Sequence, residues 1–199
     1  MDQPTVPFVV FGYGSLIFKP PPHVISRVPG YLKGYVRRFA QRSPDHRGTE
    51  ESPGRVVTLI HQEDWNEFSP SDPFPDTDIV WDPVYGGEVR GLLDIREAAG
   101  YTLEEVDVYG VGPAGEEVVV AHKAQVYVGR KDNPAFVADE SLEDIATVIW
   151  RSIGPSGPNK DYLYHLGAAI RELAPESHDS HLSVLESLCR EWDQERLLN

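Results

Sequence analysis

Cysteine is almost absent from this sequence, with Cys189 the only one among 199 residues. A single cysteine excludes an intramolecular disulfide and favours a reducing, cytoplasmic compartment. Basic residues are also few, because 18 Lys and Arg stand against 32 Asp and Glu, for a formal net charge of −14. That charge repels phosphate backbones and anionic lipids. We therefore expect no nucleic acid and no membrane surface as a partner.

Long hydrophobic runs are missing as well. The longest apolar stretches, around Phe8–Phe11 and Glu117–Ala121, are too short to cross a bilayer. An acidic residue stands near the N-terminus where a secretory signal carries a basic one, so we expect no signal peptide. The histidines are scattered, with His178 and His181 the only close pair. With one cysteine, this spacing predicts no metal site.

The residues that are present predict one folded domain. Hydrophobic residues make up 40% of the chain, enough for a core, while 17 Gly and 17 Pro indicate many turns. Positive charge gathers in residues 33–55, which we call the basic segment. Its six basic residues are Lys33, Arg37, Arg38, Arg42, Arg47 and Arg55. If the protein handles an anionic small molecule, this is where we expect it to bind.

Strand patterns dominate the first two thirds of the chain. Phe8–Phe11 is rich in β-branched and aromatic residues, and Tyr31–Ala40 alternates so that its arginines face outward. Further strands are predicted at residues 55–61, 105–109, 117–121 and 122–128. Residues 62–78 are rich in Asp, Ser and Pro and predict a surface loop.

Helical patterns dominate the last third. One earlier helix is predicted to begin at Asp82-Pro83 and to end at Gly100. The later helices begin at three expected capping residues, Ser141, Asn159 and Asp179, and Cys189 lies on the apolar side of the last one. Strands followed by packed helices predict an α+β fold around a small antiparallel sheet or barrel.

Two places on the chain could carry chemistry. The turn Gly12-Tyr13-Gly14-Ser15-Leu16-Ile17 follows a predicted strand, so its backbone N–H groups could converge on a carboxylate or carbonyl oxygen. It lacks the third glycine of a dinucleotide fingerprint, and an ordinary hairpin turn is the alternative. Glu97 lies at the end of the predicted helix, where the dipole and burial would raise its pKa toward that of a general base. A solvated glutamate, or one paired with Arg96, is the alternative there.

Seven short segments carry a family resemblance. They are Phe-Gly-Tyr-Gly-Ser-Leu-Ile at 11–17, Ser-Pro-Asp-His-Arg-Gly-Thr at 43–49, Pro-Gly-Arg-Val-Val-Thr-Leu at 53–59, Arg-Glu-Ala-Ala-Gly-Tyr at 96–101, Tyr-Val-Gly at 127–129, Asn-Pro-Ala-Phe at 133–136 and Gly-Pro-Ser-Gly-Pro-Asn at 154–159. In this order they resemble the ChaC-like, glutathione-specific gamma-glutamylcyclotransferases. The resemblance runs from about Phe8 to Leu185.

The resemblance implies a fold and an activity. The fold is a gamma-glutamylcyclotransferase-like β-barrel flanked by helices, as a single domain over 1–199 with its core at about 8–185. The activity is cleavage of reduced glutathione to 5-oxoproline and Cys-Gly, with no metal and no organic cofactor. Gly12, Tyr13, Gly14, Ser15, Leu16 and Ile17 would hold the gamma-glutamyl group, and Glu97 would be the catalytic acid and base.

Two more expectations concern side chains around the substrate. Tyr162 would line the cleft, with a purely structural core tyrosine as the alternative. At least one of Arg38, Arg47 and Arg55 is expected near Gly14, because glutathione carries two carboxylates; we expect Arg55 among the substrate-binding residues.

One departure from the family pattern bears on all of this. Val80-Trp81 runs directly into Asp82-Pro83, where the family usually has a further apolar strand, so we expect a barrel that lacks one strand near Trp81–Asp82 unless residues 78–81 supply a short one. Two alternatives to glutathione cleavage therefore stay open. One is a catalytically impaired gamma-glutamyl-binding module, and the other is a cyclotransferase for other gamma-glutamyl amines. The sequence does not indicate the oligomeric state.

Overall fold

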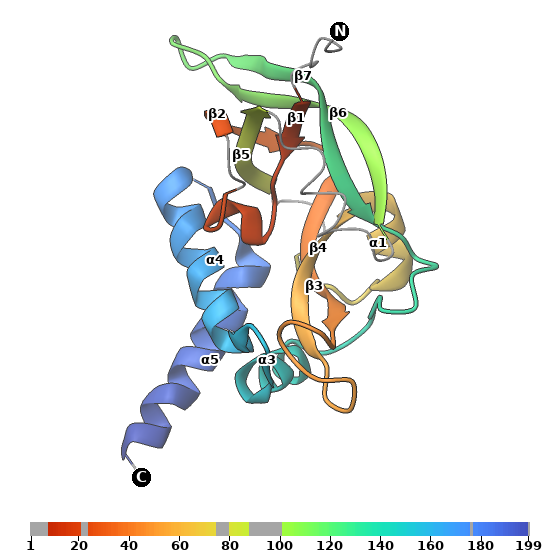
Figure 1. Cartoon of the computed structure of the whole chain (residues 1–199), viewed down its shortest axis with the longest axis vertical. Coiled ribbons are helices and arrows are strands. Elements are labelled where there is room, and N and C mark those ends of the chain that lie inside the picture. The colour runs from red at the N-terminus through yellow and green to blue at the C-terminus, as the bar shows by residue number, and fades with distance from the viewer. Residues whose placement is uncertain (1–7, 21–23, 75–79, 88–100, 176, 199) are drawn as a thin grey trace, which may run out of the picture.

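The computed structural model describes residues 8–20, 24–74, 80–87, 101–175 and 177–198 (Figure 1). Five strands close into a barrel in the order β1-β5-β2-β6-β7. Their bounds are Phe8–Phe11 for β1, Val24–Leu32 for β2, Val80–Gly87 for β5, Tyr101–Val111 for β6 and Glu117–Gly129 for β7. Neighbours are antiparallel except β1 and β7, which are parallel. The barrel is therefore mixed, and the α+β class with a small barrel is confirmed.

Strand β5 corrects two expectations at once. The helix predicted from Asp82 is wrong over the described residues, and no strand is lost at this place, because β5 pairs with β1 on one side and with β2 on the other. Pro83 lies opposite Pro29 of β2. Neither proline has an N–H to donate, so the two can share a position of the ladder where no N–H···O bonds are exchanged. Residues 88–100, which include the predicted end of that helix, lie outside the described residues.

A second, two-stranded sheet emerges beside the barrel. It consists of β3, Tyr35–Ser43, and β4, Gly54–His61, which confirms the strand predicted at 55–61. The single strand predicted for Tyr31–Ala40 is wrong, because the chain turns between β2 and β3 at Gly34, whose φ is +79°. Its arginines do not face outward either: Arg37 is 3% exposed and Arg38 1% exposed.

Two further local expectations change. Residues 62–68 form a helix, α1 (Gln62–Phe68), in place of the expected loop, because Trp65 packs against an apolar cluster on β3 and β4. The two strands predicted at 117–121 and 122–128 are one strand, β7, with Lys123 in a left-handed conformation where the register with β6 shifts. Such a bulge twists a strand without ending it.

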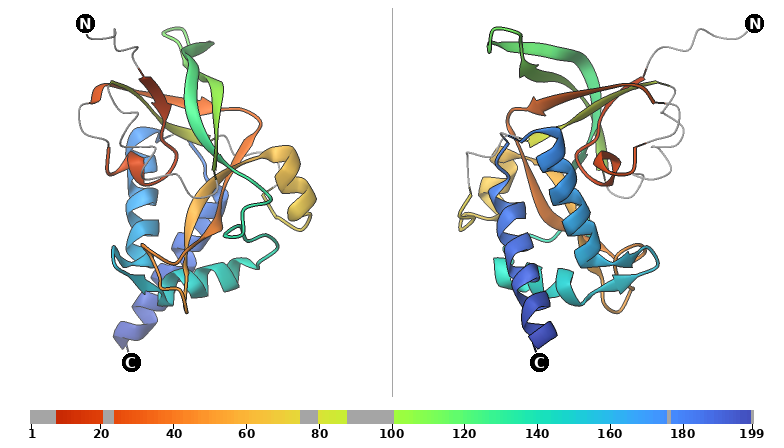
Figure 2. Two further views of the ribbon diagram at one scale, coloured as in Figure 1. Left: turned by 45° about the vertical axis from the view of Figure 1, so that its right-hand side comes forward. Right: turned by 90° about the vertical axis from the view of Figure 1, so that its left-hand side faces the viewer.

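The three predicted C-terminal helices are confirmed. They are α3 (Leu142–Arg151), α4 (Asn159–Leu173) and α5 (Ser180–Leu198), and they gather at one end of the molecule, away from the β6–β7 hairpin (Figures 1 and 2). The Oγ of Ser141 accepts the N–H of Asp144 at 3.1 Å, and a carboxylate oxygen of Asp179 accepts the N–H of Leu182 at 2.9 Å, so both caps are confirmed. Asn159 is not a cap, since Pro158 precedes the helix and Asn159 is its first residue.

Two small elements complete the fold. Ser15–Ile17 forms a 3-10 turn, η1, and the strands β8 (Ile153–Gly154) and β9 (Gly157–Pro158) form a hairpin between α3 and α4.

The core lies where the barrel meets the helices. It joins barrel residues such as Val10, Tyr85 and Val126 to helix residues such as Leu163 and Leu185. Cys189 is fully buried, as expected, and burial raises the pKa of its thiol to about 12, which keeps it protonated and unreactive.

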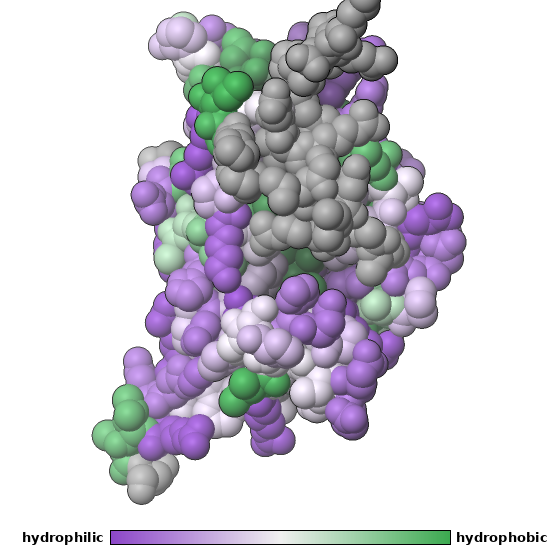
Figure 3. Space-filling view, viewed as in Figure 1, coloured by the Kyte–Doolittle hydropathy of each residue, from purple (hydrophilic) through white to green (hydrophobic). Residues whose placement is uncertain are grey.

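The coloured part of the face drawn in Figure 3 is mostly hydrophilic. Leu197 and Leu198 at the C-terminal end of α5 are exceptions in that each is 87% exposed. Among the described helices, none combines the length and the hydropathy that a membrane crossing requires.

Candidate active site

The glycine turn, residues Gly12–Ile17, leaves the end of β1 and packs onto β5. The N–H of Gly12 donates to the carbonyl of Pro83 at 3.1 Å. A Cβ at Gly12 would lie 2.9 Å from the Cβ of Leu16 and 3.0 Å from the ring of Tyr85, which is closer than ordinary contacts allow. Only glycine therefore lets the chain turn this tightly against the barrel.

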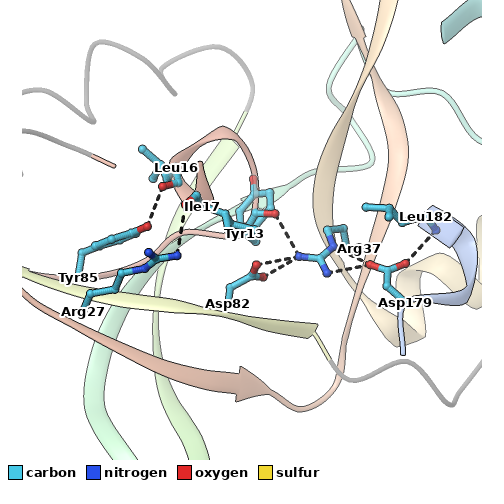
Figure 4. Close-up of polar contacts among 9 residues, drawn as sticks. All are labelled: Tyr13, Leu16, Ile17, Arg27, Arg37, Asp82, Tyr85, Asp179 and Leu182. Atoms are coloured by element: carbon cyan, nitrogen blue, oxygen red, sulfur yellow. Dashed lines mark hydrogen bonds and ion pairs between the residues drawn. The ribbon is translucent and has the colours of Figure 1, made fainter. Parts of the chain in front are cut away.

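Three side chains hold the carbonyl groups of the turn (Figure 4). The hydroxyl of Tyr85 donates to Leu16 at 2.7 Å, and the guanidinium groups of Arg27 and Arg37 donate to Ile17 at 3.4 Å and to Tyr13 at 3.3 Å. The N–H groups of Gly14, Ser15 and Leu16, in contrast, meet no acceptor in the part of the chain that the structure describes. The turn thus has its acceptors occupied and its donors available, the arrangement that suits a carboxylate or a carbonyl oxygen.

A buried ionic network anchors this turn to two distant elements. One nitrogen of Arg37 donates to both carboxylate oxygens of Asp82 on β5, at 2.8 and 2.9 Å, and the Nε donates to Asp179 before α5 at 2.8 Å (Figure 4). Burial raises the pKa of Asp82 to about 8, although Arg37 opposes the shift. Burial also disfavours the charged form of Asp179, but Arg37 and the N–H of Leu182 outweigh it and hold the pKa of that carboxyl below its ordinary value. One guanidinium thus faces two carboxylates, of which one favours its proton.

Tyr162 in the first turns of α4 reaches the glycine turn. Its hydroxyl oxygen lies 3.5 Å from the position that a Cβ of Gly14 would occupy. Its ring makes edge contacts with Phe18 and Phe39, with centroids 5.9 and 6.0 Å apart, and the residue is 5% exposed. Tyr162 is therefore a core residue whose hydroxyl lies beside the turn, and its part in substrate binding stays a prediction.

Arg47 contacts the ring of this tyrosine. The guanidinium carbon is 5.5 Å from the centroid of the Tyr162 ring, and one nitrogen donates to the carbonyl of Pro158 at 3.0 Å. The backbone N–H of Arg47 donates to the Oγ of Ser43 at 3.1 Å, which shapes the loop between β3 and β4.

Two of the segments that carry the family resemblance contact each other directly, and this contact accounts for the glycine at position 154. In 43–49 and 154–159, the N–H of Ser156 donates to the carbonyl of His46 at 2.9 Å. A Cβ at Gly154 would lie 2.4 Å from that same carbonyl oxygen. The glycine therefore permits a backbone contact that holds the Arg47 loop against the hairpin before α4.

Comparisons with known proteins settle which family this scaffold represents. The family described as "ChaC-like protein" matches residues 8–192. The chain belongs to the ChaC-like family. It is 44% identical over 191 residues to the "Glutathione-specific gamma-glutamylcyclotransferase" of Schizosaccharomyces pombe, covering 93% of each chain. It is 40% identical over 198 residues to the protein of the same name from Saccharomyces cerevisiae, covering 82% of this chain and 85% of that one.

Solved structures agree with this membership. A crystal structure of the gamma-glutamyl cyclotransferase specific to glutathione from yeast superposes with a TM-score of 0.79 at 36% identity, covering 94% of this chain and 96% of that one. A second protein, named gamma-glutamyl cyclotransferase, is 15% identical with a TM-score of 0.51 and shows the fold alone. The resemblance and the fold class expected from the sequence are thereby confirmed.

The arginines of the ChaC-like chain are placed differently from what the sequence led us to expect. Arg55 is held by the carboxylate of Glu140, at 2.9 and 2.7 Å, and by the carbonyls of Pro53 and Gly54. Arg38 is held by Asp72 at 2.7 Å. At least one of Arg38, Arg47 and Arg55 is expected near Gly14, and Arg47 is the one that contacts Tyr162. A substrate contact by Arg55 stays a prediction, and in this structure its guanidinium is committed to Glu140.

The side chain of Asn159 binds the backbone of β4, which the sequence analysis did not predict. Its side chain is fully buried and forms two bonds with the backbone of Arg55, accepting from the N–H at 2.6 Å and donating to the carbonyl at 2.8 Å. These bonds fasten the start of α4, and hence Tyr162, to the start of β4.

Glu97, the expected catalytic residue, lies outside the described residues. It precedes Tyr101, the first residue of β6, by four positions. Sequence reasoning also missed the anchoring of the glycine turn by Arg27, Arg37, Asp82 and Tyr85. No local signal could have found it, because Arg37 is 45 positions from Asp82 and 142 from Asp179.

A separate cavity of about 350 Å³ lies behind Phe39, lined by Arg38, Trp65, Asp72, Glu140 and His181 among others. Gly12–Ile17, Arg55 and Tyr162 are not among its lining residues, whereas Arg38, one of the arginines considered for the neighbourhood of Gly14, is. Burial lowers the pKa of His181 to about 4, so the ring is neutral, and its Nε2 accepts the N–H of Phe39 at 3.2 Å. Within the described ranges, no group of three or more His, Cys, Asp or Glu side chains could hold a metal ion.

Proposed function

We propose that this chain is a glutathione-specific gamma-glutamylcyclotransferase that converts reduced glutathione to 5-oxoproline and Cys-Gly. The observation that carries the proposal is the glycine turn, with three available N–H donors beside Tyr162. It occurs in a chain 44% identical to a relative named for this activity. The substrate is a small molecule, and the acidic surface charge gives no support to a nucleic-acid partner.

The reaction is an intramolecular acyl transfer. The α-amine of the gamma-glutamyl group attacks its own γ-carbonyl carbon, which closes a five-membered lactam. The bond from that carbon to the cysteine nitrogen then breaks, and Cys-Gly leaves with a proton on its new amine. Because nucleophile and electrophile share one molecule, folding the substrate into the reactive shape provides effective molarities on the order of 10⁵ M or more.

The chain's own groups divide the remaining work. Glu97 removes a proton from the attacking ammonium and returns one to the leaving nitrogen, a role worth on the order of 10² to 10⁴ in rate. Residues Gly12–Ile17 hold the gamma-glutamyl group, and the N–H groups of Gly14, Ser15 and Leu16 stabilise the oxyanion that develops on the γ-carbonyl. Tyr162 borders this pocket, and Arg55 completes the proposed binding set.

Both alternative functions are weaker on what is now known. A binding module without turnover was an alternative because the sequence indicated a missing strand, yet β5 closes the barrel. A cyclotransferase for other gamma-glutamyl amines is less favoured, because the names of the relatives specify glutathione. We further propose a single domain over 1–199 with its core at about 8–185, and a cytoplasmic location, which rests on the one buried cysteine.

The first test is product formation. Purified protein incubated with reduced glutathione should release Cys-Gly and 5-oxoproline in equal amounts, and gamma-glutamylalanine should react more slowly. Absence of Cys-Gly, with glutathione still raising the melting temperature, would leave a binding module instead. Faster turnover of gamma-glutamylalanine would point to the broader cyclotransferase.

The second test separates chemistry from binding. A Glu97→Gln variant keeps the side-chain volume but cannot accept the proton, so turnover should fall by about 10² or more while glutathione still raises the melting temperature. Glu105→Gln, at an exposed position on β6, is the matched control and should be fully active. Near wild-type turnover by Glu97→Gln would exclude Glu97 as the base.

A further inference from the structure

Four arginines are buried in the described part of the chain, and all four come from the basic segment. Three of them are neutralised by carboxylates: Arg37 by Asp82 and Asp179, Arg38 by Asp72, and Arg55 by Glu140. Arg47 is 7% exposed and forms no ion pair with any described residue. The fold thus pairs three buried guanidinium groups with carboxylates and leaves the fourth, that of Arg47, without a described carboxylate partner.

The contacts of Arg47 do not compensate its charge. It donates one hydrogen bond to the carbonyl of Pro158 and lies over the ring of Tyr162. Burial lowers the pKa of its guanidinium from the ordinary value, and the electrostatic effects of Tyr162 and of Asp161, which forms no ion pair with it, oppose that shift without cancelling it. A guanidinium has five N–H donors, so one carbonyl leaves most of them without an acceptor.

An uncompensated buried cation is costly, and buried charges in proteins are normally paired. An anion that binds at Arg47 would supply the missing partner. The location of Arg47 indicates which anion. Tyr162 contacts Arg47 with its ring and the glycine turn with its hydroxyl, so an anion on Arg47 lies next to a group held by the turn. The glycine turn and Arg47 are therefore both neighbours of Tyr162, which makes them candidates for one binding region.

We propose that Arg47 binds a carboxylate of the substrate, in a subsite that it forms with the ring of Tyr162 beside the glycine turn. This inference rests on the proposed function, because glutathione supplies two carboxylates, one on the gamma-glutamyl α-carbon and one on the glycine. The planar guanidinium matches a carboxylate with two parallel N–H···O bonds, which lysine cannot reproduce. Arg47, and not the Glu140-bound Arg55, is the residue that this subsite requires.

Kinetics of an Arg47→Met variant test the subsite. Loss of a charge-assisted hydrogen bond should raise the KM for glutathione roughly 10- to 100-fold, with a smaller change in kcat. The KM of Arg47→Lys should lie between those of the wild type and Arg47→Met. Arg42→Met is the control, because Arg42 is exposed in the same basic segment, and its KM should equal that of the wild type. An unchanged KM for Arg47→Met would overturn the inference.

A second substrate identifies the carboxylate. Glutathione whose glycine carboxylate is replaced by a carboxamide should be a poor substrate of the wild type if Arg47 binds the glycine end, and Arg47→Met should then no longer distinguish the two substrates. If Arg47 binds the gamma-glutamyl end, the variant should lose affinity for both substrates equally.

Thermal melting separates this inference from a purely structural role and from the proposed function. Without glutathione, Arg47→Met should melt at or above the melting temperature of the wild type, because the substitution removes a buried unpaired charge. Addition of glutathione should no longer raise the melting temperature of this variant. A lower melting temperature with a normal glutathione response would show that Arg47 only supports the fold. If the wild type is stabilised by glutathione through Arg47 but releases no Cys-Gly, the inference stands and the proposed function fails. If glutathione raises the melting temperature of neither the wild type nor Arg47→Met, the inference fails.

Discussion

At the scale of single residues, the structure separates the protein's net charge from its local charges. The chain carries −14 overall, yet four arginines of the described ranges are buried, and three of these are bound to buried or half-buried carboxylates. A buried ion pair contributes little net stability, but removing one partner leaves the other charged group unpaired at a high cost. Substitution of Arg37 or Arg38 therefore reports on folding, whereas substitution of Arg47 reports on a ligand.

Tyr162 gives a residue-scale prediction about the turn. Tyr162→Phe keeps the ring packing with Phe18 and Phe39 and removes only the hydroxyl beside Gly14. We expect roughly a 2- to 10-fold loss in kcat/KM for glutathione, the value of about one hydrogen bond, with a nearly unchanged melting temperature.

Tyr164→Phe is the matched control for this variant. It lies on the same helix and its hydroxyl donates to Asp193 at 2.8 Å, remote from the turn, so its kinetics should be normal. A large loss of stability in Tyr162→Phe together with normal kinetics would show that its hydroxyl serves the core alone.

At the scale of secondary-structure elements, the site depends on how β3, β5 and α5 are joined. Arg37 of β3 contacts the glycine turn, Asp82 of β5 and Asp179 at the start of α5. The turn is thus positioned by groups from three elements far apart in the sequence.

The pH dependence of stability tests this junction. The pKa of Asp82 is about 8 in the folded protein and about 3.8 when exposed. The folded state therefore holds this proton more tightly, so the stability from Asp82 is complete below about pH 4 and is lost as the pH rises toward 8. Asp82→Asn resembles the protonated form. The unfolding free energy of the wild type, measured by urea titration, should fall relative to this variant by up to about 1.4 kcal/mol per pH unit across that window.

Asp179→Asn should behave in the opposite way. The pKa of Asp179 is lowered, so its stabilising effect is present at neutral pH and disappears as the pH falls through the acidic range. This variant should be less stable than the wild type at pH 7 and approach it in acid.

For Asp82, a contrary result is also defined. Parallel pH profiles of unfolding free energy for the wild type and Asp82→Asn would show that Asp82 is ionised throughout, and would contradict its raised pKa.

At the scale of the whole molecule, the strand pairs that close the barrel differ in how many residues they pair. We call the boundary between two neighbouring strands a seam. β2 runs beside β5 along most of its length, whereas Tyr31↔Tyr109 is the one residue pair that joins β2 to β6 in the described ladder. Gly30 lies at this seam, and a Cβ there would be 2.6 Å from a methyl of Val108 and 2.9 Å from the carbonyl of Tyr109.

Gly30→Ala should therefore open the β2–β6 seam. The backbone carbonyl cannot move aside as a side chain can, so we expect a loss of about 1–3 kcal/mol in unfolding free energy. Gly112→Ala is the control, because its added Cβ meets only the flexible carboxylate of Glu116 in a hairpin. Equal stability of Gly30→Ala and Gly112→Ala in a denaturant titration would show that the seam can widen without cost.

The sequence by itself determined the features that depend on neighbouring residues. The strand before the glycine turn, the caps at Ser141 and Asp179, the three C-terminal helices and the buried cysteine all follow from local periodicity and local hydrogen bonds. The order of the seven segments that carry the family resemblance also identified the family. Such features are set within a few residues, so a linear pattern contains them.

Only the tertiary structure decided the features that depend on distant partners. Asp82-Pro83 has the local pattern of a helix start, but β1 and β2 on either side make it a barrel strand, because a strand's hydrogen bonds are satisfied by its neighbours and not by itself. The sequence predicted that the arginines of β3 face outward, but Asp72, Asp82 and Asp179 come from other parts of the chain and allow Arg37 and Arg38 to be buried. Whether a charged residue is a surface group, a structural ion pair or a ligand contact is decided by the carboxylates that folding brings to it, and for Arg47 folding brings none from the described chain.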